Sequence, residues 1–492
     1  MANTLRRTAA GLAMAVMAAF AVPGGPAQAA SAGGGGLDGV WRMDGYGTVM
    51  TVKDGKLASY DTTSDSCVRG FMDARQAGSP APDGATRFTN KDIGLAMTFA
   101  PQGRRHARLD LDGTVGVRHM KRLAALPEEC GRAAPEDPRS VFDRFWATFA
   151  ENYPFFEAKG IDWEALGNRY RSRVTPHTTD AELQQIFTGM IRPLNDAHTA
   201  LFHELTPVFG GLRPGTRLPT DELRARAARA VDRQLVGPVR TFAQGNLAVG
   251  ELPDGIAYLR INSFSGYVAD GTFEQERAEL DRALDALLGD GKSDGKSDGK
   301  SDGKSDGKGD SDGTDRVRAL RGLVIDVRLN DGGSDALGLR IASRLTDRAY
   351  TAYTKVARND PRDPNRYTRP QPITVRPSDA PRWTGPVAVL TSGSSISAAE
   401  SFTQALIERS PGVTRIGENT QGVFSDTLTR ILSEKWAVML PNEKYLDRNG
   451  DTFDGPGIPP HVQTPVFTEE ELDGGLDSAL TAARKVLGTP SS

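Results

Sequence analysis

Ser397 lies where a serine hydroxyl can act as a nucleophile. The apolar residues 387–390 predict a buried strand, and the polar segment after it leads at once into a predicted helix over residues 398–409. A serine at such a strand-to-helix turn exposes its hydroxyl at the carboxyl edge of the sheet, beside backbone N–H groups at the positive end of the helix. The alternative is that Ser397 only caps the N-terminus of that helix.

Two further segments carry groups that a serine nucleophile needs. Gly332 and Gly333 follow a second apolar strand, and paired glycines let backbone N–H groups approach a ligand closely. The alternative for them is a tight turn between a strand and a helix. His198 lies in a compact polar cluster near a predicted helix end, although a single histidine is more often structural or exposed.

The chemistry favours histidine over lysine as the base. A serine hydroxyl is a weak nucleophile and needs a base of near-neutral pKa within hydrogen-bond reach. Histidine meets this requirement without a large pKa shift. A lysine would have to lose its hydration and several units of pKa, and the sequence places none for that role.

Alternating strands and helices position these residues. Strands are predicted at 256–261, 323–327, 387–390 and 413–416, with helices near 273–288, 335–345 and 398–409 between them. This order predicts right-handed crossovers and a largely parallel sheet, so we assign residues 204–470 to an α/β catalytic core. A helical region is predicted over 137–203, where Asp137 caps one helix and Thr179 with Glu182 forms a capping box on another.

The N-terminal part of the sequence has a different pattern of predicted secondary structure. Residues 37–130 show short β-type runs separated by Asp-Gly turns, which predict a small antiparallel β domain. Residues 1–29 read as a signal peptide, because Arg6 and Arg7 precede an apolar stretch and a small-residue cleavage pattern. The arginine pair leaves open whether export is general or of the twin-arginine type. In a secreted or extracytoplasmic protein, Cys67 and Cys130 are expected to form a disulfide.

Composition excludes several classes of partner. The 492 residues include 60 Lys and Arg against 63 Asp and Glu, a net charge of -3 that gives no footprint for nucleic acid. The expected mature chain has no segment long and apolar enough to span a membrane. We predict no metal and no cofactor, because the Cys and His spacings match no zinc motif. Residues 289–315 are Gly-Lys-Ser-Asp repeats and predict a disordered insertion.

At this point the sequence resembles the S41 serine peptidases, which include C-terminal processing peptidases and tricorn protease. The resemblance covers about residues 137–470. It rests on five motifs in family order: Asp196-Ala197-His198-Thr199, residues 326–333, Ser397-Ala398-Ala399-Glu400, Gly417-Glu418-Asn419-Thr420-Gln421-Gly422, and Asp454-Gly455-Pro456-Gly457-Ile458-Pro459-Pro460.

The resemblance implies roles for individual residues. Ser397 becomes the nucleophile, with the N–H groups of Ala398 and of Gly332 or Gly333 as oxyanion donors. The processing branch has a lysine base where this chain has Val423, so the histidine base of the tricorn-like branch, at His198, is implied instead.

The remaining members of a catalytic triad are less well matched. In the tricorn-like branch a serine and a glutamate orient the histidine, and this chain has Ala197 and Asp454 at those positions. Glu443, on a neighbouring predicted strand, is the reserve candidate for the orienting acid.

These residues predict an exported serine endopeptidase that cleaves a peptide or protein substrate through an acyl-enzyme. The alternative is a non-catalytic protein that binds a lipophilic ligand or peptide on the same scaffold, since the core also resembles the repeats of interphotoreceptor retinoid-binding protein. Residues 204–250 are too few for the PDZ domain common in the family. The sequence leaves the oligomeric state and the cleavage preference open.

Overall fold

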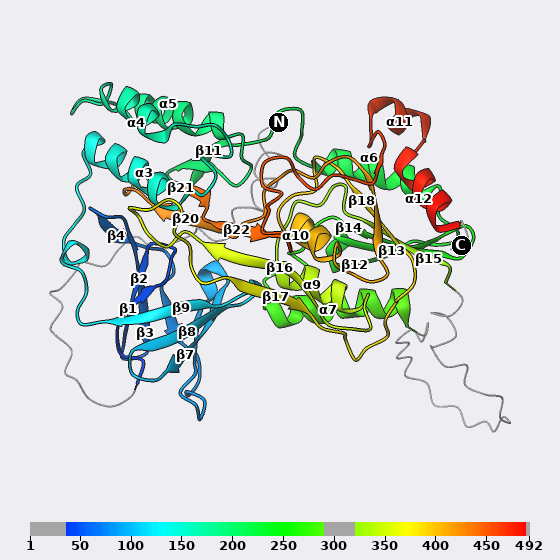
Figure 1. The fold of residues 1–492 in the computed structure, drawn as a ribbon, viewed down its shortest axis with the longest axis horizontal. Coiled ribbons are helices and arrows are strands. Elements are labelled where there is room, and N and C mark those ends of the chain that lie inside the picture. The colour runs from blue at the N-terminus through cyan, green and yellow to red at the C-terminus, as the bar shows by residue number, and fades with distance from the viewer. Residues whose placement is uncertain (1–35, 290–319, 489–492) are drawn as a thin grey trace.

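The computed structural model describes residues 36–289 and 320–488 (Figure 1). The predicted signal peptide, and the predicted insertion except for Gly289, therefore lie outside the described residues. None of the helices within the described ranges is long and apolar enough to cross a membrane. The predicted fold class is confirmed: an antiparallel β unit and helices precede an α/β core with parallel strands.

The N-terminal unit is an antiparallel sheet that closes on itself. Its order is β2-β1-β9-β8-β7-β6-β5-β3-β4, and β2 also pairs with β3, so the strands form a barrel with β4 outside the ring. The strands are β1 (Gly39–Met43), β2 (Thr48–Lys53), β3 (Lys56–Thr62), β4 (Cys67–Arg69), β5 (Ala74–Gln76), β6 (Thr86–Asn90), β7 (Leu95–Gln102), β8 (His106–Leu111) and β9 (Arg118–Leu123).

Alternation of side chains fills the barrel. Trp41 and Met43 of β1 are buried, whereas Arg42 between them is exposed, as the two-residue period of a strand requires. Trp41 contacts Phe99 across the interior, with ring centroids 5.3 Å apart. The predicted disulfide is present: Cys67 of β4 is bonded to Cys130 in the short helix η2 (Glu128–Gly131), which ties the barrel to the segment that leaves it.

A helical unit follows, and its core includes strands from far along the chain. Phe187 of a helix and Trp436 of a strand meet with ring centroids 5.5 Å apart. The unit's sheet has the order β11-β10-β21-β20. Its elements are α3 (Pro138–Asn152), α4 (Trp163–Arg171), α5 (Asp180–Ile191), η3 (Arg192–Leu194), β10 (Ala200–His203), β11 (Thr206–Gly210), β20 (Thr427–Ile431) and β21 (Trp436–Pro441). The predicted caps at Asp137 and Thr179 are confirmed.

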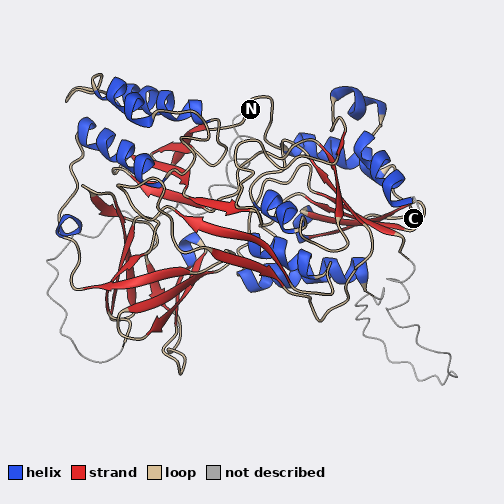
Figure 2. Ribbon diagram, viewed as in Figure 1, coloured by secondary structure: helices blue, strands red, loops and turns tan. Residues whose placement is uncertain are grey.

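The α/β core has a seven-stranded sheet in the order β12-β13-β14-β15-β18-β19-β23, parallel from β14 onward. Helices cover both of its faces (Figure 2). Its elements are α6 (Asp221–Asp232), β12 (Arg240–Phe242), η4 (Ala243–Gly245), β13 (Leu247–Leu252), β14 (Ile256–Ile261), α7 (Phe273–Leu288), β15 (Gly322–Asp326), α9 (Asp335–Ser343), β18 (Val387–Thr391), α10 (Ala398–Ala405), β19 (Val413–Gly417), β23 (Val462–Gln463), α11 (Glu469–Gly474) and α12 (Ser478–Gly488).

Successive residues of the central strands face opposite helices. Val387 and Val389 pack in the cluster that contains α7, α9 and α10, whereas Ala388 and Leu390 pack with α6 and α12. Strands buried on both faces explain the continuous apolar runs in the sequence. The helix predicted at 398–409 is real but ends at Ala405.

A third sheet, β17-β16-β22, joins the core to the barrel. Figure 1 shows β16 (Tyr350–Ala357) and β17 (Gln371–Val375) reaching from the core toward the barrel, and β22 (Glu443–Leu446) pairs with the end of β16. This sheet brings Lys355 and Glu443 to the junction between the units.

Four buried or largely buried charges form what we call the junction cluster: Arg118, Lys355, Asp426 and Glu443. Lys355 Nζ lies 3.0 Å from Asp426 and 3.1 Å from Glu443, and Arg118 of the barrel lies 2.7 Å from Asp426. Burial alone would lower the pKa of Lys355, but the two carboxylates outweigh it and hold this pKa above its usual value. Lys355 therefore stays charged and paired with both carboxylates.

Lys355→Met tests the cluster. It should lower the free energy of unfolding by about 3–5 kcal/mol, because two carboxylates would remain buried with one cation fewer. Lys435→Met is the matched control, since Lys435 pairs with Asp180 at 2.7 Å on the surface and should change the thermal midpoint little. Calorimetry of both variants measures the difference, and equal midpoints would contradict the structural importance of the cluster.

Candidate active site

Ser397 occupies a strained turn between β18 and α10. Its backbone angles, φ 57° and ψ −116°, lie in a region that non-glycine residues rarely adopt. The side chain is half-buried. A serine held this way at the start of a helix differs from an ordinary N-cap, whose backbone is usually extended.

Hydrogen bonds from the preceding serines hold this turn against the neighbouring loop. Ser392 Oγ donates to the carbonyl of Arg328 at 2.5 Å, and Ser395 Oγ donates to the carbonyl of Val327 at 2.8 Å. Because β15 and β18 are adjacent and parallel, the loops at their carboxyl ends must lie side by side. The sheet thus brings two of the three predicted segments together.

Gly332 lies directly against Ser397. A Cβ atom added to Gly332 would be 2.8 Å from Ser397 Cβ and 3.4 Å from its Oγ, so only glycine fits. The N–H of Gly332 already donates to Asn330 Oδ1 at 2.8 Å. Within the described ranges, the N–H groups of Gly333 and Ala398 have no acceptor, and these are the two donors left available beside the serine.

His198 lies on a turn between η3 and β10. Asp196 Oδ1 accepts the His198 main-chain N–H at 2.9 Å, and Asp196 Oδ2 accepts the Tyr153 hydroxyl at 2.7 Å. The imidazole is 1% exposed, and its Nδ1 has no hydrogen-bond partner among the described residues. Burial lowers the pKa of His198, and the charges of Asp196 and Asp426 oppose this. The ring is therefore neutral, and it shares no hydrogen bond with Ser397.

The two acid candidates occupy different surroundings. Asp454 is buried, where its Oδ2 accepts the Thr452 hydroxyl at 2.6 Å and its Oδ1 accepts the Phe424 N–H at 3.2 Å. Burial, with the nearby charge of Asp196, raises the pKa of Asp454 to about 7. Glu443 belongs to the junction cluster and also accepts the Tyr46 hydroxyl of the barrel. Neither carboxylate is hydrogen-bonded to His198 Nδ1.

Glu400 is a site residue for which the sequence analysis assigned no role. Its carboxyl group accepts the N–H of Ser397 at 3.1 Å, of Gly422 at 2.6 Å and of Val423 at 2.9 Å. Burial raises its pKa to about 8, against the effect of these donors. The spacing of Ser397 and Glu400, which is that of a capping box, was the available signal. Val423, at the position of the lysine in the processing branch, contributes only its main chain.

The buried lysine of the junction cluster offers no base. Lys355 is 3% exposed and paired with two carboxylates, which favour its charged form. A base must be neutral to accept a proton. Lys355 therefore does not overturn the preference for histidine.

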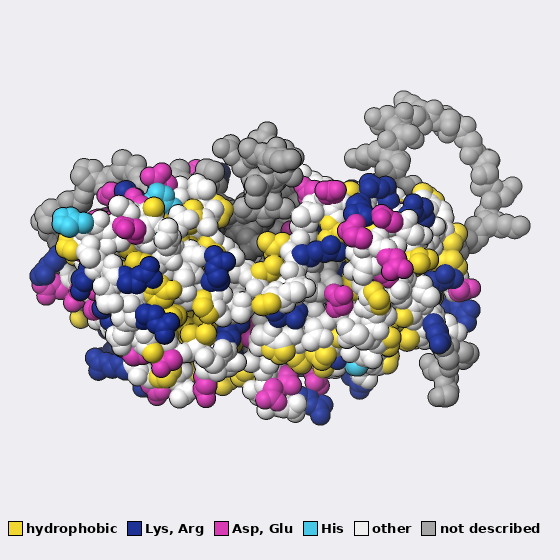
Figure 3. Space-filling view, turned by 90° about the horizontal axis from the view of Figure 1, so that it is seen from above, with side chains coloured by type: hydrophobic (Ala, Val, Ile, Leu, Met, Phe, Trp, Pro, Cys, Tyr) yellow, Lys and Arg dark blue, Asp and Glu magenta, His cyan; other side chains and the backbone are white. Residues whose placement is uncertain are grey.

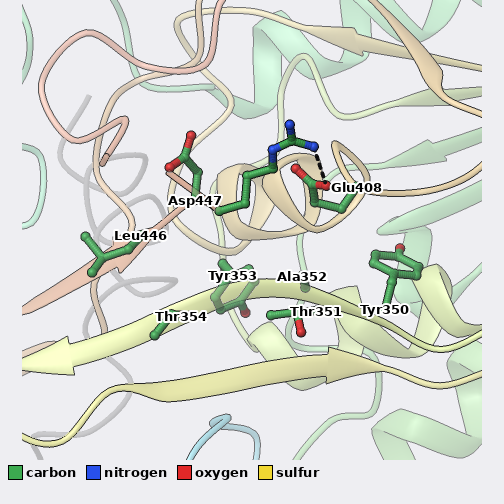
Figure 4. A pocket seen from close by; sticks show the side chains of 9 residues that line it. Tyr350, Thr351, Ala352, Tyr353, Thr354, Glu408, Leu446 and Asp447 are labelled. Atoms are coloured by element: carbon green, nitrogen blue, oxygen red, sulfur yellow. Dashed lines mark ion pairs between the residues drawn. The ribbon is translucent and has the colours of Figure 1, made fainter. Parts of the chain in front are cut away.

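A cavity of about 210 Å³ lies at the other end of α10 from Ser397 (Figure 4). Residues 350–354 of β16 line one side of it. Arg448 and Glu408, which also line it, form an ion pair with 3.6 Å between Nη1 and Oε2. None of the residues predicted for the active site lines this cavity. It is distinct from the groups beside Ser397.

Comparison with known proteins identifies two regions. Residues 308–464 match the model of peptidase family S41, and residues 134–192 match that of the tricorn protease C1 domain. The first region contains Ser397 and both acid candidates, whereas His198 lies six residues beyond the end of the second. No curated protein sequence matches the chain.

Solved structures also resemble the chain. A candidate peptidase from Parabacteroides merdae ATCC 43184 is 25% identical, with a TM-score of 0.57 over 73% of this chain and 98% of that one. Mature CPAF is 12% identical, with a TM-score of 0.48 over 72% of this chain and 96% of that one.

The pKa of Asp454 predicts a pH-dependent stability change. Between about pH 4 and pH 7 the native carboxyl keeps a proton that the unfolded chain has lost, so this contribution to stability is present in acid and lost as the pH rises toward 7. Asp454→Asn should leave the free energy of unfolding near pH 4 almost unchanged and raise it at pH 8 by up to about 4 kcal/mol. Urea unfolding at both pH values measures this.

The exposed Asp451→Asn is the control for that experiment, and it should have the same small effect at both pH values. An effect of Asp454→Asn that does not change with pH would show that Asp454 is ionised throughout.

Proposed function

We propose that this chain, an S41-type serine peptidase and thus a hydrolase, is an exported endopeptidase that cleaves peptide bonds through an acyl-enzyme on Ser397. One observation carries the proposal: Ser397 is held at φ 57° with Gly332 against it and two unpaired backbone donors nearby. Strain of this kind costs of order 1–3 kcal/mol and is concentrated at functional sites.

In the proposed first step, Ser397 Oγ attacks the carbonyl carbon of the scissile bond while His198 takes the hydroxyl proton. The negative charge that develops on the carbonyl oxygen is stabilised by the N–H groups of Gly333 and Ala398. The second of these lies at the N-terminus of α10, where the helix dipole favours negative charge. His198 then gives the proton to the departing amine, and the acyl group remains on Ser397.

Hydrolysis of the acyl-enzyme reverses these roles. His198 takes a proton from water, the hydroxide attacks the ester, and Ser397 recovers its proton. The absence of a hydrogen bond between His198 and Ser397 is compatible with this scheme, because catalytic hydrogen bonds often tighten only when substrate is bound.

We assign the orienting role to Asp454. Its pKa is raised partly by the charge of Asp196, whose main chain and side chain build the turn of His198. Glu443 is supported less well, since its oxygens are engaged by Tyr46, by Lys355 and by the N–H of Asp426. An acid in this position fixes the tautomer and stabilises the imidazolium without transferring a proton itself.

Export and a protein substrate are supported by separate features. The Cys67–Cys130 disulfide suits an oxidising compartment, in keeping with the signal-like residues 1–29. On the face shown in Figure 3, basic and acidic side chains are interspersed rather than gathered by sign. Membership in the S41 family supports peptides or proteins as substrates.

Ser397→Ala tests the nucleophile. Hydrolysis of fluorescein-labelled casein should fall by orders of magnitude, and labelling by a fluorophosphonate probe should disappear, while the thermal midpoint changes little. Ser410→Ala, at an exposed serine beyond α10, is the control and should label normally. Intact-mass detection of an adduct on the wild-type protein checks the acyl-enzyme. A folded wild-type protein that neither labels nor hydrolyses would favour a binding protein.

His198→Gln tests the base. Burial lowers the pKa of His198, so kcat/KM should rise with pH through an ionisation below about 6.5, and loss of the Asp454 proton near pH 7 should add a second, smaller rise. The variant should lose the first rise and most of the rate, Asp454→Asn should lose less, and the control His203→Gln should keep the first rise. Full activity in His198→Gln with a profile that turns only in the alkaline range would assign the base to a lysine.

A further inference from the structure

A short segment between β11 and α6, residues 211–217, contacts the turn of His198 at one end. We call it the strap. Gly211 donates its N–H to the carbonyl of Thr199 at 2.8 Å. A Cβ on Gly211 would lie 2.0 Å from the carbonyl oxygen of Asp196, so the backbone is in direct contact with the turn. The start of the strap is therefore fixed on the residues that flank His198.

The other end of the strap contacts the loop of Ser397. Ser394 Oγ donates to the carbonyl of Arg217 at 2.6 Å. A Cβ on Gly393 would lie 2.7 Å from Thr216 Cγ2, so the two segments pack without a gap. Thr216 is five positions after Gly211, a span of at most about 18 Å. The strap therefore contacts the segments of both His198 and Ser397.

Arg213, in the middle of the strap, binds a third segment, residues 419–421. Its Nε donates to the carbonyl of Gln421 at 2.9 Å, and its Nη2 donates to the carbonyls of Thr420 at 2.6 Å and Asn419 at 3.4 Å. A guanidinium group presents its donors in a rigid planar fork, which a lysine ammonium cannot reproduce. Arg213 thus donates hydrogen bonds to three consecutive carbonyl groups.

Gln421 extends these contacts to the nucleophile loop. Its Nε2 donates to the carbonyl of Gly393 at 2.9 Å, and its main-chain N–H donates to the carbonyl of Ser395 at 3.0 Å. The next two residues, Gly422 and Val423, donate to Glu400, which also accepts the N–H of Ser397. A continuous set of hydrogen bonds therefore leads from Arg213 to the backbone of the nucleophile.

We infer that Arg213 is a positioning residue that holds Ser397 in its reactive conformation by fixing residues 419–423 and, through them, Glu400. This inference rests on the proposed role of Ser397 as the nucleophile. Arg213 does not touch the reacting atoms. Without its guanidinium, the carbonyls of 419–421 lose their shared donor, and Glu400 is free to shift together with the N–H groups of Ser397 and Ala398.

The test compares Arg213→Ala and Arg213→Lys with wild type in two assays. Hydrolysis of fluorescein-labelled casein separates kcat from KM, and the second-order rate of fluorophosphonate labelling reports on Ser397 without substrate recognition. Both kcat and the labelling rate should fall by about 10²-fold in Arg213→Ala, with KM nearly unchanged, since a misplacement of about 1 Å has that effect. Millimolar guanidinium should restore part of the labelling rate in Arg213→Ala only. Arg213→Lys, which keeps the charge and is expected to fold, should remain impaired.

Arg226→Ala is the control, because Arg226 on α6 pairs with exposed acids of α11 and lies outside the Arg213 network. Hydrogen exchange of the amides of Gly422 and Val423 supplies an arm that does not depend on activity: exchange should accelerate at least tenfold in both Arg213 variants and remain normal in the control. Folded Arg213 variants with normal labelling and normal exchange would overturn the inference. If the wild-type protein never labels but exchange is still faster in the Arg213 variants, the contact network is supported and the proposed nucleophile is refuted.

Discussion

The arrangement of the whole molecule depends on burying four charges together. Arg118 enters from the barrel, Lys355 from β16, Glu443 from β22 and Asp426 from the residue before β20. A single buried charge of this kind costs several kcal/mol, whereas the set of two cations and two carboxylates is neutral. In this arrangement of the barrel and the core, each of the four buried charges has a partner of opposite sign.

The electrostatic influence of this cluster extends to α10, the helix that follows Ser397. Burial and the charge of Asp426 together raise the pKa of Asp335 to about 6. Asp335 accepts the hydroxyl of Ser401, one turn after Ser397 in α10, at 2.5 Å. The N-terminal barrel, which lies outside the regions matched to known families, is thus connected through charge to the helix of the candidate site.

Local signals explain what the sequence could predict. The capping box at Thr179 and the apolar period of residues 273–288 involve residues within one helix, and both elements are found as expected. Ser397, Gly332 and Gly333 were recognisable because each follows an apolar strand, and the parallel sheet then brings them together.

Contacts between distant segments gave no such signal. Arg118 and Asp426 are 308 residues apart, and Arg213 and Gln421 are 208 apart, with nothing in either local sequence to indicate a partner. For the same reason the pairing of β10 with β21, which completes the helical unit, was not anticipated. The sequence offered Asp454 as the orienting acid with Glu443 in reserve, and weighing the two requires knowing which other groups surround each carboxylate.

The amide of Gln421 shows how narrowly this site tolerates genetic change. Its Oε1 accepts the N–H of Arg213 at 3.3 Å, and its Nε2 donates to the carbonyl of Gly393 at 2.9 Å, all within a side chain that is 1% exposed. A single-nucleotide change converts a glutamine codon to glutamate, a side chain of the same shape. That replacement would set a second acceptor against the Gly393 carbonyl in a buried position. The replacement should therefore break this buried contact although size and shape are preserved.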